Sequence, residues 1–530
     1  MTGVPADEVL PQLVHKRATS ADADRPFLAE VGGDFLTYAE VDRAGRAWGY
    51  GLQEYGVKAG SRVAVMLPTS TDSFLIWLAC GWLHAYDVPI HVQYRGAIMR
   101  HILDNSGAEV IIIRADFLEA LWSLDDALPS LKHVIVIPAP EGEAADWRAG
   151  VPAGWADRIV DRAALPEGEV PPENGPNYWD SAAIVYTSGT TGPAKGVLVP
   201  WRLFHKHGQV TFPLAYVGPE DCYYCPLPLS HIAGRVGIYN MALVGGRAVL
   251  RERFSLEAYW DDCATYGCTS TIMMGASAEM LFRRPPSEQD AETPLKNVLM
   301  GPLITQLDEF RERFGVRVRT QFGMTEASPP LISGIENDWD LANGESCGRV
   351  VPGYHVRVGD ENDEPLGPGQ VGELLIRTED PWLLMAGYWQ DPESTAKALR
   401  NQWFHTGDAV RYDEDGNFYY VDRIKDTIRR RGENISSYFV EQAINEHPAV
   451  VESAVVGVTS SFTEQEIHAF VVPKDGAAID GEEIRIFLDG KLPGFMIPRF
   501  WSAIDALPRT STHRVRKVEL RERAQAEHQA

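Results

Sequence analysis

The stretch YTSGTTGPAKG, from Tyr186 to Gly196, decides which fold and chemistry this chain is expected to have. Hydroxyl groups and glycine N–H groups crowd into one loop that ends in a cation, an arrangement suited to holding phosphate oxygens. The preceding apolar residues 182–185 predict a short buried strand, so we expect the loop at a strand end, where open α/β sheets bind ligands. A flexible turn is the plain alternative, but four hydroxyls, three glycines and a lysine in eleven residues favour a phosphate site. The candidate residues are Thr187, Ser188, Gly189, Thr190, Thr191, Gly192 and Lys195.

The loop is not an ordinary P-loop, in which a lysine directly follows the last glycine and a Ser or Thr follows the lysine. Here Pro193 and Ala194 separate Gly192 from Lys195, and Gly196 comes next. The string instead resembles the phosphate-binding signature of the adenylate-forming superfamily. That family includes acyl- and aryl-CoA ligases, insect luciferases and the adenylation domains of peptide synthetases. The resemblance runs from about Thr37 to about Leu520 and implies that ATP is bound.

Composition sets limits on the function. A chain of 530 residues is too long for one core, so several subdomains are expected. The formal charge of −25 disfavours nucleic acid or an anionic membrane as a partner. The longest apolar stretch, from Phe74 to Tyr86, is too short to cross a bilayer, so no integral membrane segment is expected. Composition does not indicate the oligomeric state.

The six cysteines do not form a disulfide framework, and residues 1–7 lack the basic start and apolar run of a signal peptide. We therefore expect a reducing, cytoplasmic location. The Cys222–Cys225 pair has CxxC spacing, which suits zinc or redox chemistry. It lies in a strand-like aromatic run, however, and packing in the core is the expected role.

Apolar strands alternate with amphipathic helices, which predicts an α/β fold. We expect a large N-terminal domain over residues 1–422, with two α/β sheets and a β-rich subdomain near 344–420. A hinge follows at 423–427. A small mobile α+β domain is expected over 428–530, with a helix, two strands, a helix and a tail.

The patch QFGMTEA, residues 321–327, resembles a second family motif. The resemblance implies that Phe322 stacks on adenine, that Thr325 meets the α-phosphate and that Glu326 holds Mg²⁺. The chemistry agrees, because Mg²⁺ prefers oxygen ligands and shares them with phosphates. A helix N-cap beside a buried phenylalanine is the structural alternative.

The patch FHTGDAV, residues 404–410, resembles a third motif. Asp408 stands where the family holds the ribose hydroxyls, a task suited to a carboxylate that accepts two hydrogen bonds. The resemblance also implies that Arg423 reaches the ribose or phosphate and that Gly301 lines the adenine pocket.

The patch PLPLSHIAG, residues 226–234, places His231 at the family's position at the mouth of the acyl pocket. Amino-acid-activating relatives tend to carry an aspartate near here; residues 226–234 contain none, so an α-amino acid is disfavoured. Arg235 is expected either to meet a polar or anionic group of the substrate or to point outward.

Lys425 matches the family hinge residue, and RGENIS, residues 431–436, resembles the loop that lines the pantetheine tunnel of coenzyme A. Its Gly432 permits a close approach of backbone to a thin ligand. The consecutive arginines 429–431 form a local basic patch that either meets the coenzyme A phosphates or remains solvated.

The last motif departs from the family pattern. In LPRTSTHRVRKVEL, residues 507–520, Arg514 stands where relatives carry the lysine that bridges carboxylate and α-phosphate. Three readings follow: Arg514 substitutes for the lysine, Lys517 serves after a shift of the loop, or the oxyanion or acceptor is unusual. Arginine keeps the charge but is planar and bidentate, so it is not equivalent to lysine.

Taken together, the resemblance implies an AMP-forming acid–thiol ligase. It would use ATP and Mg²⁺ to convert a carboxylic acid to its acyl-adenylate, with coenzyme A as acceptor. The catalytic candidates are Arg514, His231, Thr325 and Glu326. The alternatives are an amide synthetase, a nitrite-activating diazotase, a luciferase-like oxygenase and a non-catalytic nucleotide sensor.

Overall fold

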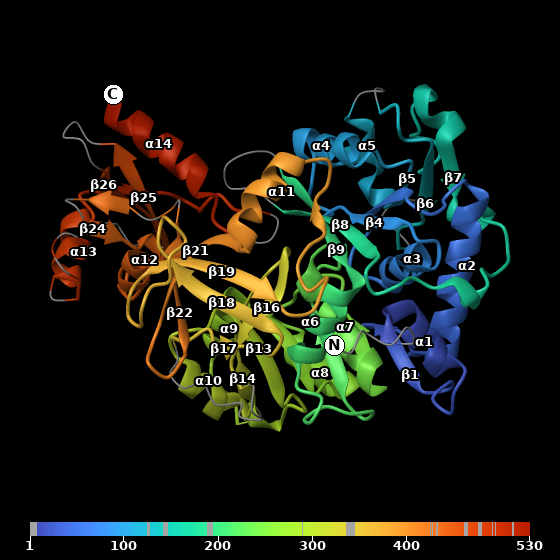
Figure 1. Cartoon of the computed structure of the whole chain (residues 1–530), viewed down its shortest axis with the longest axis horizontal. Coiled ribbons are helices and arrows are strands. Elements are labelled where there is room, and N and C mark those ends of the chain that lie inside the picture. The colour runs from blue at the N-terminus through green and yellow to red at the C-terminus, as the bar shows by residue number, and fades with distance from the viewer. Residues whose placement is uncertain are drawn as a thin grey trace. The chain divides into compact units, whose positions relative to one another are not determined.

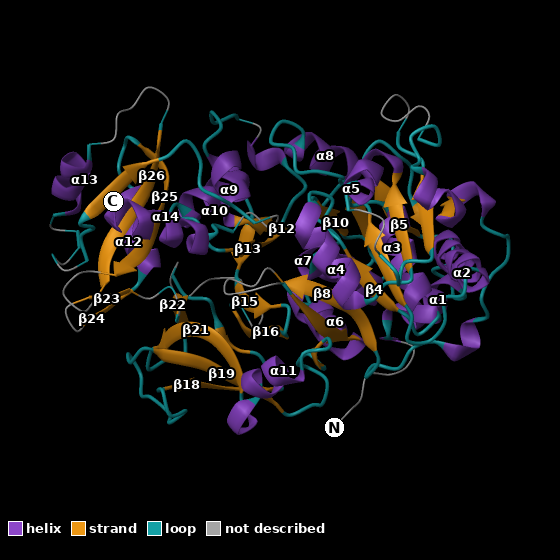
Figure 2. Ribbon diagram, turned by 90° about the horizontal axis from the view of Figure 1, so that it is seen from above, coloured by secondary structure: helices purple, strands orange, loops and turns teal. Residues whose placement is uncertain are grey.

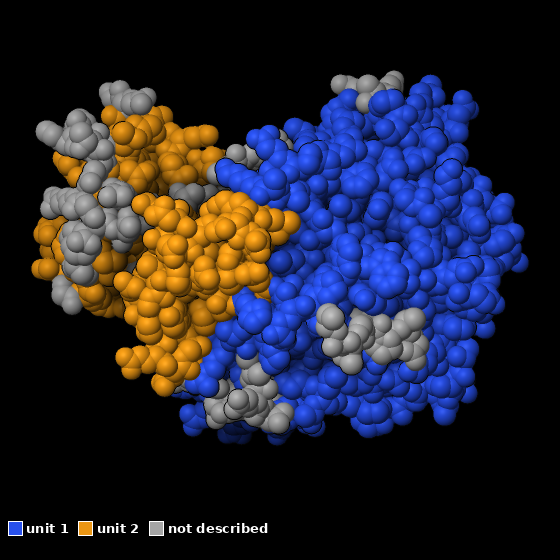
Figure 3. Space-filling view, viewed as in Figure 1, with its two compact units in different colours: residues 1–187, 193–355, 378–397 blue, residues 188–192, 356–377, 398–530 orange. Residues whose placement is uncertain are grey.

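The computed structural model describes residues 8–124, 128–140, 147–187, 194–288, 290–334, 345–424, 426, 428–430, 433–459, 465–474, 480–489, 491–492, 494, 496–510 and 514–529. Contacts between residues divide it into two compact units, coloured separately in Figure 3. The first unit takes in the described residues of 1–187, 193–355 and 378–397. The second takes in those of 356–377 and 398–530.

One large sheet of the first unit contains the strands on both sides of the phosphate loop (Figure 1). Its strands, in order across the sheet, are β20 (Gly387–Tyr388), β9 (Lys195–Pro200), β8 (Ser181–Thr187), β4 (Tyr86–Pro89), β3 (Arg62–Met66), β5 (Val110–Arg114), β6 (His133–Ile137) and β7 (Ile159–Asp161). β8 is parallel to β4, but β9 is antiparallel to β8 and to β20. The phosphate loop therefore connects two antiparallel neighbours, not a strand and a helix.

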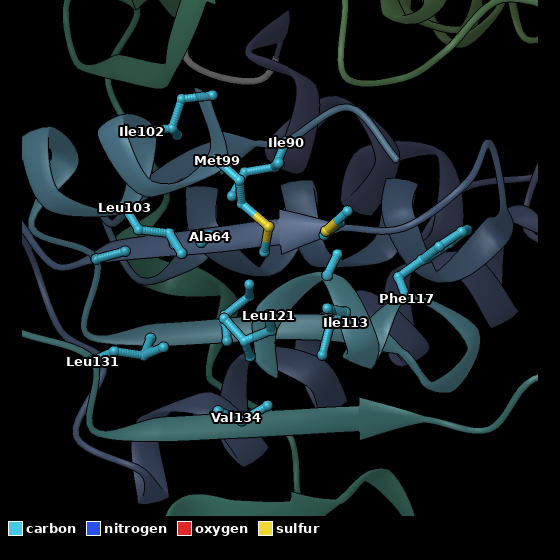
Figure 4. Close-up of a cluster of buried hydrophobic side chains, with 14 of the residues drawn as sticks. Ala64, Ile90, Met99, Ile102, Leu103, Ile113, Phe117, Leu121, Leu131 and Val134 are labelled. Atoms are coloured by element: carbon cyan, nitrogen blue, oxygen red, sulfur yellow. The ribbon is translucent and has the colours of Figure 1, made fainter. Parts of the chain in front are cut away.

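Helices cover this sheet because its central strands are apolar on both faces. Every residue of β5 is buried, as expected for a parallel strand enclosed on both sides. Figure 4 shows Met99, Ile102 and Leu103 of α4 (Gly96–Ser106) packed in the cluster that includes Ala64 of β3 and Ile113 of β5. The other helices of this region are α2 (Tyr38–Glu54), α3 (Thr71–Trp82) and α5 (Leu118–Trp122). α2 begins with a capping box between Thr37 and Glu40.

The second large sheet belongs to the same unit. Its order is β14 (Arg317–Arg319), β13 (Asn297–Gly301), β12 (Ser270–Met274), β10 (Cys222–Cys225), β11 (Arg247–Leu250), β1 (Pro26–Glu30) and β2 (Leu36–Thr37). Its strands run parallel except for β2. The associated helices are α1 (Leu10–Ala18), α6 (Trp201–Thr211), α7 (Ile232–Val244), α8 (Tyr259–Tyr266), α9 (Gly275–Phe282) and α10 (Leu307–Phe314). α1, α2 and α3 pack on one another (Figure 2).

The CxxC pair lies in the core, as predicted. Cys222 and Cys225 are fully buried in β10, and both are free thiols. Among the described residues, no group of three or more His, Cys, Asp or Glu side chains is arranged to hold a metal ion.

A small sheet of β15 (Gln321–Met324), β16 (Ala327–Ile332) and β17 (Arg349–Val350) carries the second motif, and α11 (Pro392–Ala398) follows β20. β15 and β16 are antiparallel and are joined at Thr325 and Glu326. These two residues therefore lie at a turn between strands and not at the start of a helix.

The second unit contains residues 356–377 and 398–420 of the predicted β-rich subdomain, together with the small α+β part. Its first sheet has the order β18 (Tyr354–Gly359), β19 (Gly372–Thr378), β21 (Phe404–Tyr412) and β22 (Phe418–Arg423). The C-terminal part contains β23 (Ile428–Arg430), β24 (Glu433–Ile435), α12 (Ser437–Asn445), β25 (Val450–Thr459), β26 (Gln465–Pro473), α13 (Gly481–Leu488), β27 (Phe500–Ala503) and α14 (Lys517–Gln529). The expected tail is thus a strand and a helix. No helix in the described part of the chain has the length and apolar character needed to cross a membrane.

Candidate active site

The two ends of the phosphate loop meet as a strand pair. Thr187 closes β8 and Lys195 opens β9, and the two residues are direct partners in the ladder. The Thr187 hydroxyl donates to the carbonyl of Lys195 at 3.5 Å. The candidates Ser188, Gly189, Thr190, Thr191 and Gly192 lie outside the described residues.

The ammonium of Lys195 has two contacts that the motif does not predict. Its Nζ donates to Ser394 Oγ at 2.7 Å and lies 4.9 Å from the centroid of the Tyr388 ring. The second contact is within cation–π range. Tyr388 is on β20, the strand that pairs with β9, so backbone pairing brings the ring to the lysine.

The same tyrosine contacts the predicted metal ligand. Tyr388 donates from its hydroxyl to Glu326 Oε1 at 3.0 Å. Glu326 and its neighbour Thr325 are both buried. A carboxylate provides the oxygen ligands that Mg²⁺ prefers, and bound phosphates commonly complete such a site. The donor types therefore fit the predicted metal.

The two adenine candidates come from neighbouring strands. Phe322 is half-buried on β15, and Gly301 ends β13, which packs beside β15. Thr320 Oγ1 donates to the carbonyl of Met300 at 2.7 Å, which ties the start of β15 to the end of β13. The two sequence-predicted residues therefore stand on strands that contact each other.

His231 begins α7 as its N-cap. Its Nδ1 accepts from the backbone N–H of Ala233 at 3.4 Å. The ring also acts electrostatically on buried His207: burial lowers the pKa of His207 to about 3, and His231 adds to the effect. Gln321, at the start of β15, is hydrogen-bonded to His207 Nε2 at 3.0 Å. Sequence reasoning singled out neither His207 nor Gln321.

Arg235 was expected either to meet a polar or anionic group of the substrate or to point outward. In the structure it does neither, because it is paired with a carboxylate in the core. Its Nη1 lies 2.5 Å from Asp87 Oδ2 of β4, and both side chains are almost fully buried. Its Nε donates to the Leu229 carbonyl at 2.5 Å, and its guanidinium lies 4.7 Å from the Trp77 ring. Burial raises the pKa of Asp87, and Arg235 opposes this rise. The arginine balances a core carboxylate.

Asp408 and Arg423 are partners in the second unit. They stand opposite each other on β21 and β22, and Arg423 Nε lies 2.7 Å from Asp408 Oδ1. Only 2% of the Asp408 side chain is exposed, while Arg423 is partly exposed. The two predicted ribose residues therefore form one pair that antiparallel strand register fixes.

At the C-terminal motif, the backbones of Thr510 and Arg514 are hydrogen-bonded to each other. Thr510 N–H donates to the Arg514 carbonyl at 2.7 Å. Lys517 points elsewhere: its Nζ donates to Ser437 Oγ at 2.6 Å and pairs with Glu441 Oε1 at 2.7 Å. Because its ammonium is engaged there, the reading in which Lys517 replaces the family lysine loses support.

Of the arginines in the predicted basic patch, residues 429–431, Arg430 is the one whose side chain the structure describes. Arg430 is buried, with Nη2 2.7 Å from Glu466 Oε2 and Nη1 donating to the Ile497 carbonyl at 3.1 Å. Arg430 therefore forms an ion pair in the core and does not act as a phosphate ligand. Lys425, Arg431 and Gly432 lie outside the described residues.

The fold is that of the adenylate-forming class of enzymes. The AMP-binding enzyme family matches residues 15–389, and the AMP-binding enzyme C-terminal domain matches residues 440–514. The chain belongs to the AMP-binding enzyme family. The predicted family, fold class and enzyme class, an adenylate-forming ligase, are thereby confirmed.

Individual relatives agree over nearly the whole length. The chain is 30% identical over 472 residues to a crotonobetaine/carnitine–CoA ligase of Salmonella heidelberg (strain SL476), covering 88% of this chain and 89% of the relative. Its fold matches ATP-bound MatB from Rhodopseudomonas palustris with a TM-score of 0.82 at 24% identity, over 97% and 99% of the two chains. The amide bond synthetase McbA from Marinactinospora thermotolerans matches with a TM-score of 0.79 at 24% identity, over 98% and 100%.

Proposed function

We propose that this protein is an AMP-forming acid–CoA ligase, which activates a carboxylic acid as its acyl-adenylate and transfers the acyl group to coenzyme A. The observation that carries the proposal is the linkage of Lys195 at the phosphate loop to Glu326 through Tyr388. A cation for phosphate oxygens and an acid for Mg²⁺ are thereby held in one assembly. The full-length CoA ligase relative supports the same activity.

The reaction has two steps in this proposal. A carboxylate oxygen of the substrate attacks the α-phosphorus of ATP, the bond to the β-phosphate breaks, and pyrophosphate leaves. The thiol of coenzyme A then attacks the acyl carbonyl carbon, and AMP leaves with the electron pair of the broken C–O bond. Positioning and charge stabilisation provide the catalysis.

Each predicted residue has a role in the proposal. The phosphate loop, residues 187–195, binds the β- and γ-phosphates, and Phe322 and Gly301 bind adenine. Thr325 meets the α-phosphate. Mg²⁺, when bound by Glu326, neutralises charge on the phosphates. The other roles are these: Asp408 and Arg423 bind the ribose, His231 lies at the acyl pocket, Gly432 lines the pantetheine path and Arg514 bridges carboxylate and α-phosphate.

The proposal includes a moving C-terminal domain. Residues 428–530 turn about Lys425 in the hinge 423–427, relative to residues 1–422, between the two steps. The separate match of the C-terminal domain family, which starts at residue 440, supports a boundary in this region. A cytoplasmic location is also part of the proposal, and the six free cysteines support it.

The experiment also includes a second candidate function, because Arg514 replaces the family lysine. Arg514 occupies the sequence position of that lysine and keeps its positive charge, so it is the cation proposed for the bridge. An altered bridge fits an amide-forming or nitrite-activating enzyme as the second candidate.

The experiment is ATP–pyrophosphate exchange over a panel of carboxylic acids plus nitrite, followed by product analysis with coenzyme A and with amines. We expect exchange with at least one carboxylate and a thioester when coenzyme A is added. Exchange with nitrite alone would exclude the ligase. Exchange with a carboxylate followed by amide but no thioester would establish the second candidate.

A further inference from the structure

A short segment contacts both the second motif, residues 321–327, and the strand that follows the phosphate loop. We call residues 384–395 the strap. It starts at the second motif, where Leu384 bridges Ala327 and Met385 N–H donates to the Glu326 carbonyl at 2.8 Å. It then reaches β9, where Trp389 N–H donates to the Gly196 carbonyl at 2.7 Å. The strap thus hydrogen-bonds to the backbone of both motifs.

Two glycines make this close approach possible. Gly387 has φ of 143°, in the region that favours glycine. A Cβ at Gly196 would lie 2.8 Å from Ile184 Cγ2 and 3.3 Å from Trp389 Cβ. The glycine after the phosphate-loop lysine therefore lets the strap pack directly on β9.

The strap also has its own internal hydrogen bonds. Tyr388 N–H donates to Thr395 Oγ1 at 2.9 Å, and that hydroxyl donates to the Asp391 carbonyl at 2.9 Å. Trp389 Nε1 donates to the carbonyl of Asn105 on α4 at 3.0 Å. These bonds fix the backbone from which the Tyr388 ring projects.

Tyr388 presents a different surface to each motif. Its ring face lies 4.9 Å from Lys195 Nζ, and its hydroxyl donates to Glu326 Oε1 at 3.0 Å. A phenolic hydroxyl that donates to a carboxylate oxygen fixes the carboxylate rotamer and leaves lone pairs of both oxygens for a metal. The ring attracts the ammonium without neutralising it.

A second residue of the strap, Ser394, also contacts Lys195. Ser394 accepts from the lysine ammonium at 2.7 Å, and Ser394 N–H donates to Asp391 Oδ1 at 2.9 Å. Hydrogen bonds from Ser394 lower the pKa of Asp391, and the charge of Lys195 lowers it further. Asp391 therefore carries its negative charge at neutral pH and interacts electrostatically with Lys195.

We propose that Tyr388 is a positioning residue that sets Glu326 and Lys195 for MgATP: its hydroxyl orients the metal-binding carboxylate, and its ring places the phosphate-binding ammonium. This inference rests on the proposed function, because it assumes that both side chains act on ATP. Tyr388 belongs to neither of the two sequence motifs, so the inference gives the strap a function of its own.

The test measures ATP binding by calorimetry at a series of Mg²⁺ concentrations, so that its readout is equilibrium affinity and not turnover. Tyr388→Phe removes the hydroxyl and keeps the ring; we expect the Mg²⁺ concentration for half-maximal affinity to rise about tenfold, as loss of a hydrogen bond to a charged group predicts. ATP affinity at saturating Mg²⁺ should stay within about twofold. Tyr388→Leu should also weaken ATP binding at saturating Mg²⁺, because the ring is lost.

Two controls separate positioning from a general structural effect. Tyr412→Phe removes a hydroxyl that donates to the Leu366 carbonyl at 3.1 Å in the second unit, and it should leave the Mg²⁺ dependence unchanged. In the Glu326→Gln background, Tyr388→Phe should have no further effect on the Mg²⁺ dependence, since it acts through that carboxylate.

A wild-type Mg²⁺ dependence in Tyr388→Phe would overturn the inference, as would an equal loss in the presence and absence of the Glu326 carboxylate. Failure of the proposed function is distinguishable. In that case the wild-type protein would bind MgATP but show no pyrophosphate exchange with any acid, and the binding experiment would still decide the role of Tyr388.

Discussion

Lys517 Nζ lies 2.7 Å from Glu441 Oε1 and joins the first residue of α14 to the middle of α12. Glu441 also accepts the backbone N–H of Val455 at 2.7 Å. Burial raises the pKa of Glu441, and Lys517 opposes that rise. The lysine nearest to the family's catalytic position is therefore a structural counter-ion.

Lys517→Met is expected to destabilise the C-terminal part by about 3 kcal/mol, because it leaves a largely buried carboxylate without its cation. Thermal unfolding followed by circular dichroism measures the effect. Adding Glu441→Gln should recover a large share of the loss, since the uncompensated charge is gone. If Lys517→Met keeps full stability and abolishes only pyrophosphate exchange, Lys517 is the catalytic cation after all.

Arg514→Ala is expected to slow pyrophosphate exchange by about 100-fold or more, because it removes a cation from the developing charge at the α-phosphate. The melting temperature should change little, since the Arg514 side chain is exposed. Arg516→Ala removes a nearby arginine, paired with Glu519, and is the matched control.

Arg514→Lys separates the remaining readings of this position. We expect faster exchange, because lysine restores the point charge that relatives use. Slower exchange would show that the site is built around the planar guanidinium. An unchanged rate in Arg514→Ala would remove the residue from the mechanism.

Local patterns predicted most of the architecture. The apolar run before the phosphate loop became β8, and the Gly- and Pro-rich stretch after Asp360 became the turn between β18 and β19. Helix α14 was missed because it is strongly polar: among its described residues only Leu520 and Ala524 are buried, too weak an apolar stripe to stand out.

Partners distant in sequence could not be predicted. Nothing near Arg235 indicates that Asp87 of β4 will meet it, and nothing near Arg430 indicates Glu466. Tyr388 was likewise overlooked, because its role depends on β20 pairing with β9. Motifs report which side chains the chemistry requires, whereas the packing of distant elements decides which charges stay available for it.

The buried Arg235–Asp87 pair is expected to contribute to the stability of the protein. Arg235→Met should destabilise the protein by about 3–5 kcal/mol, because Asp87 is left buried and unpaired. Arg235→Met with Asp87→Leu should recover much of this loss, since apolar replacements of buried pairs are often neutral. Both are measured by thermal unfolding.

The same variants test whether Arg235 selects the acid. The ranking of carboxylic acids in pyrophosphate exchange should be unchanged in the double variant, because the arginine is an internal counter-ion. A selective loss of dicarboxylic acids would instead mean that Arg235 reaches the substrate.

Acid sensitivity should depend on His207. Its pKa is lowered to about 3, chiefly by burial and further by His231, so the folded protein keeps this ring neutral. The unfolded chain takes up the proton near pH 6.5, and stability falls as the pH drops from there toward 3. Within this window, each such proton lowers the free energy of unfolding by about 1.4 kcal/mol per pH unit.

His207→Gln removes the group that takes up the proton and keeps a side chain able to hydrogen-bond to Gln321. The melting temperature of this variant should therefore fall less steeply than that of the wild type between pH 6.5 and 5. His355→Gln, at an exposed position, should keep the wild-type slope. A slope in His207→Gln equal to that of the wild type would show that the buried ring is not a source of acid sensitivity.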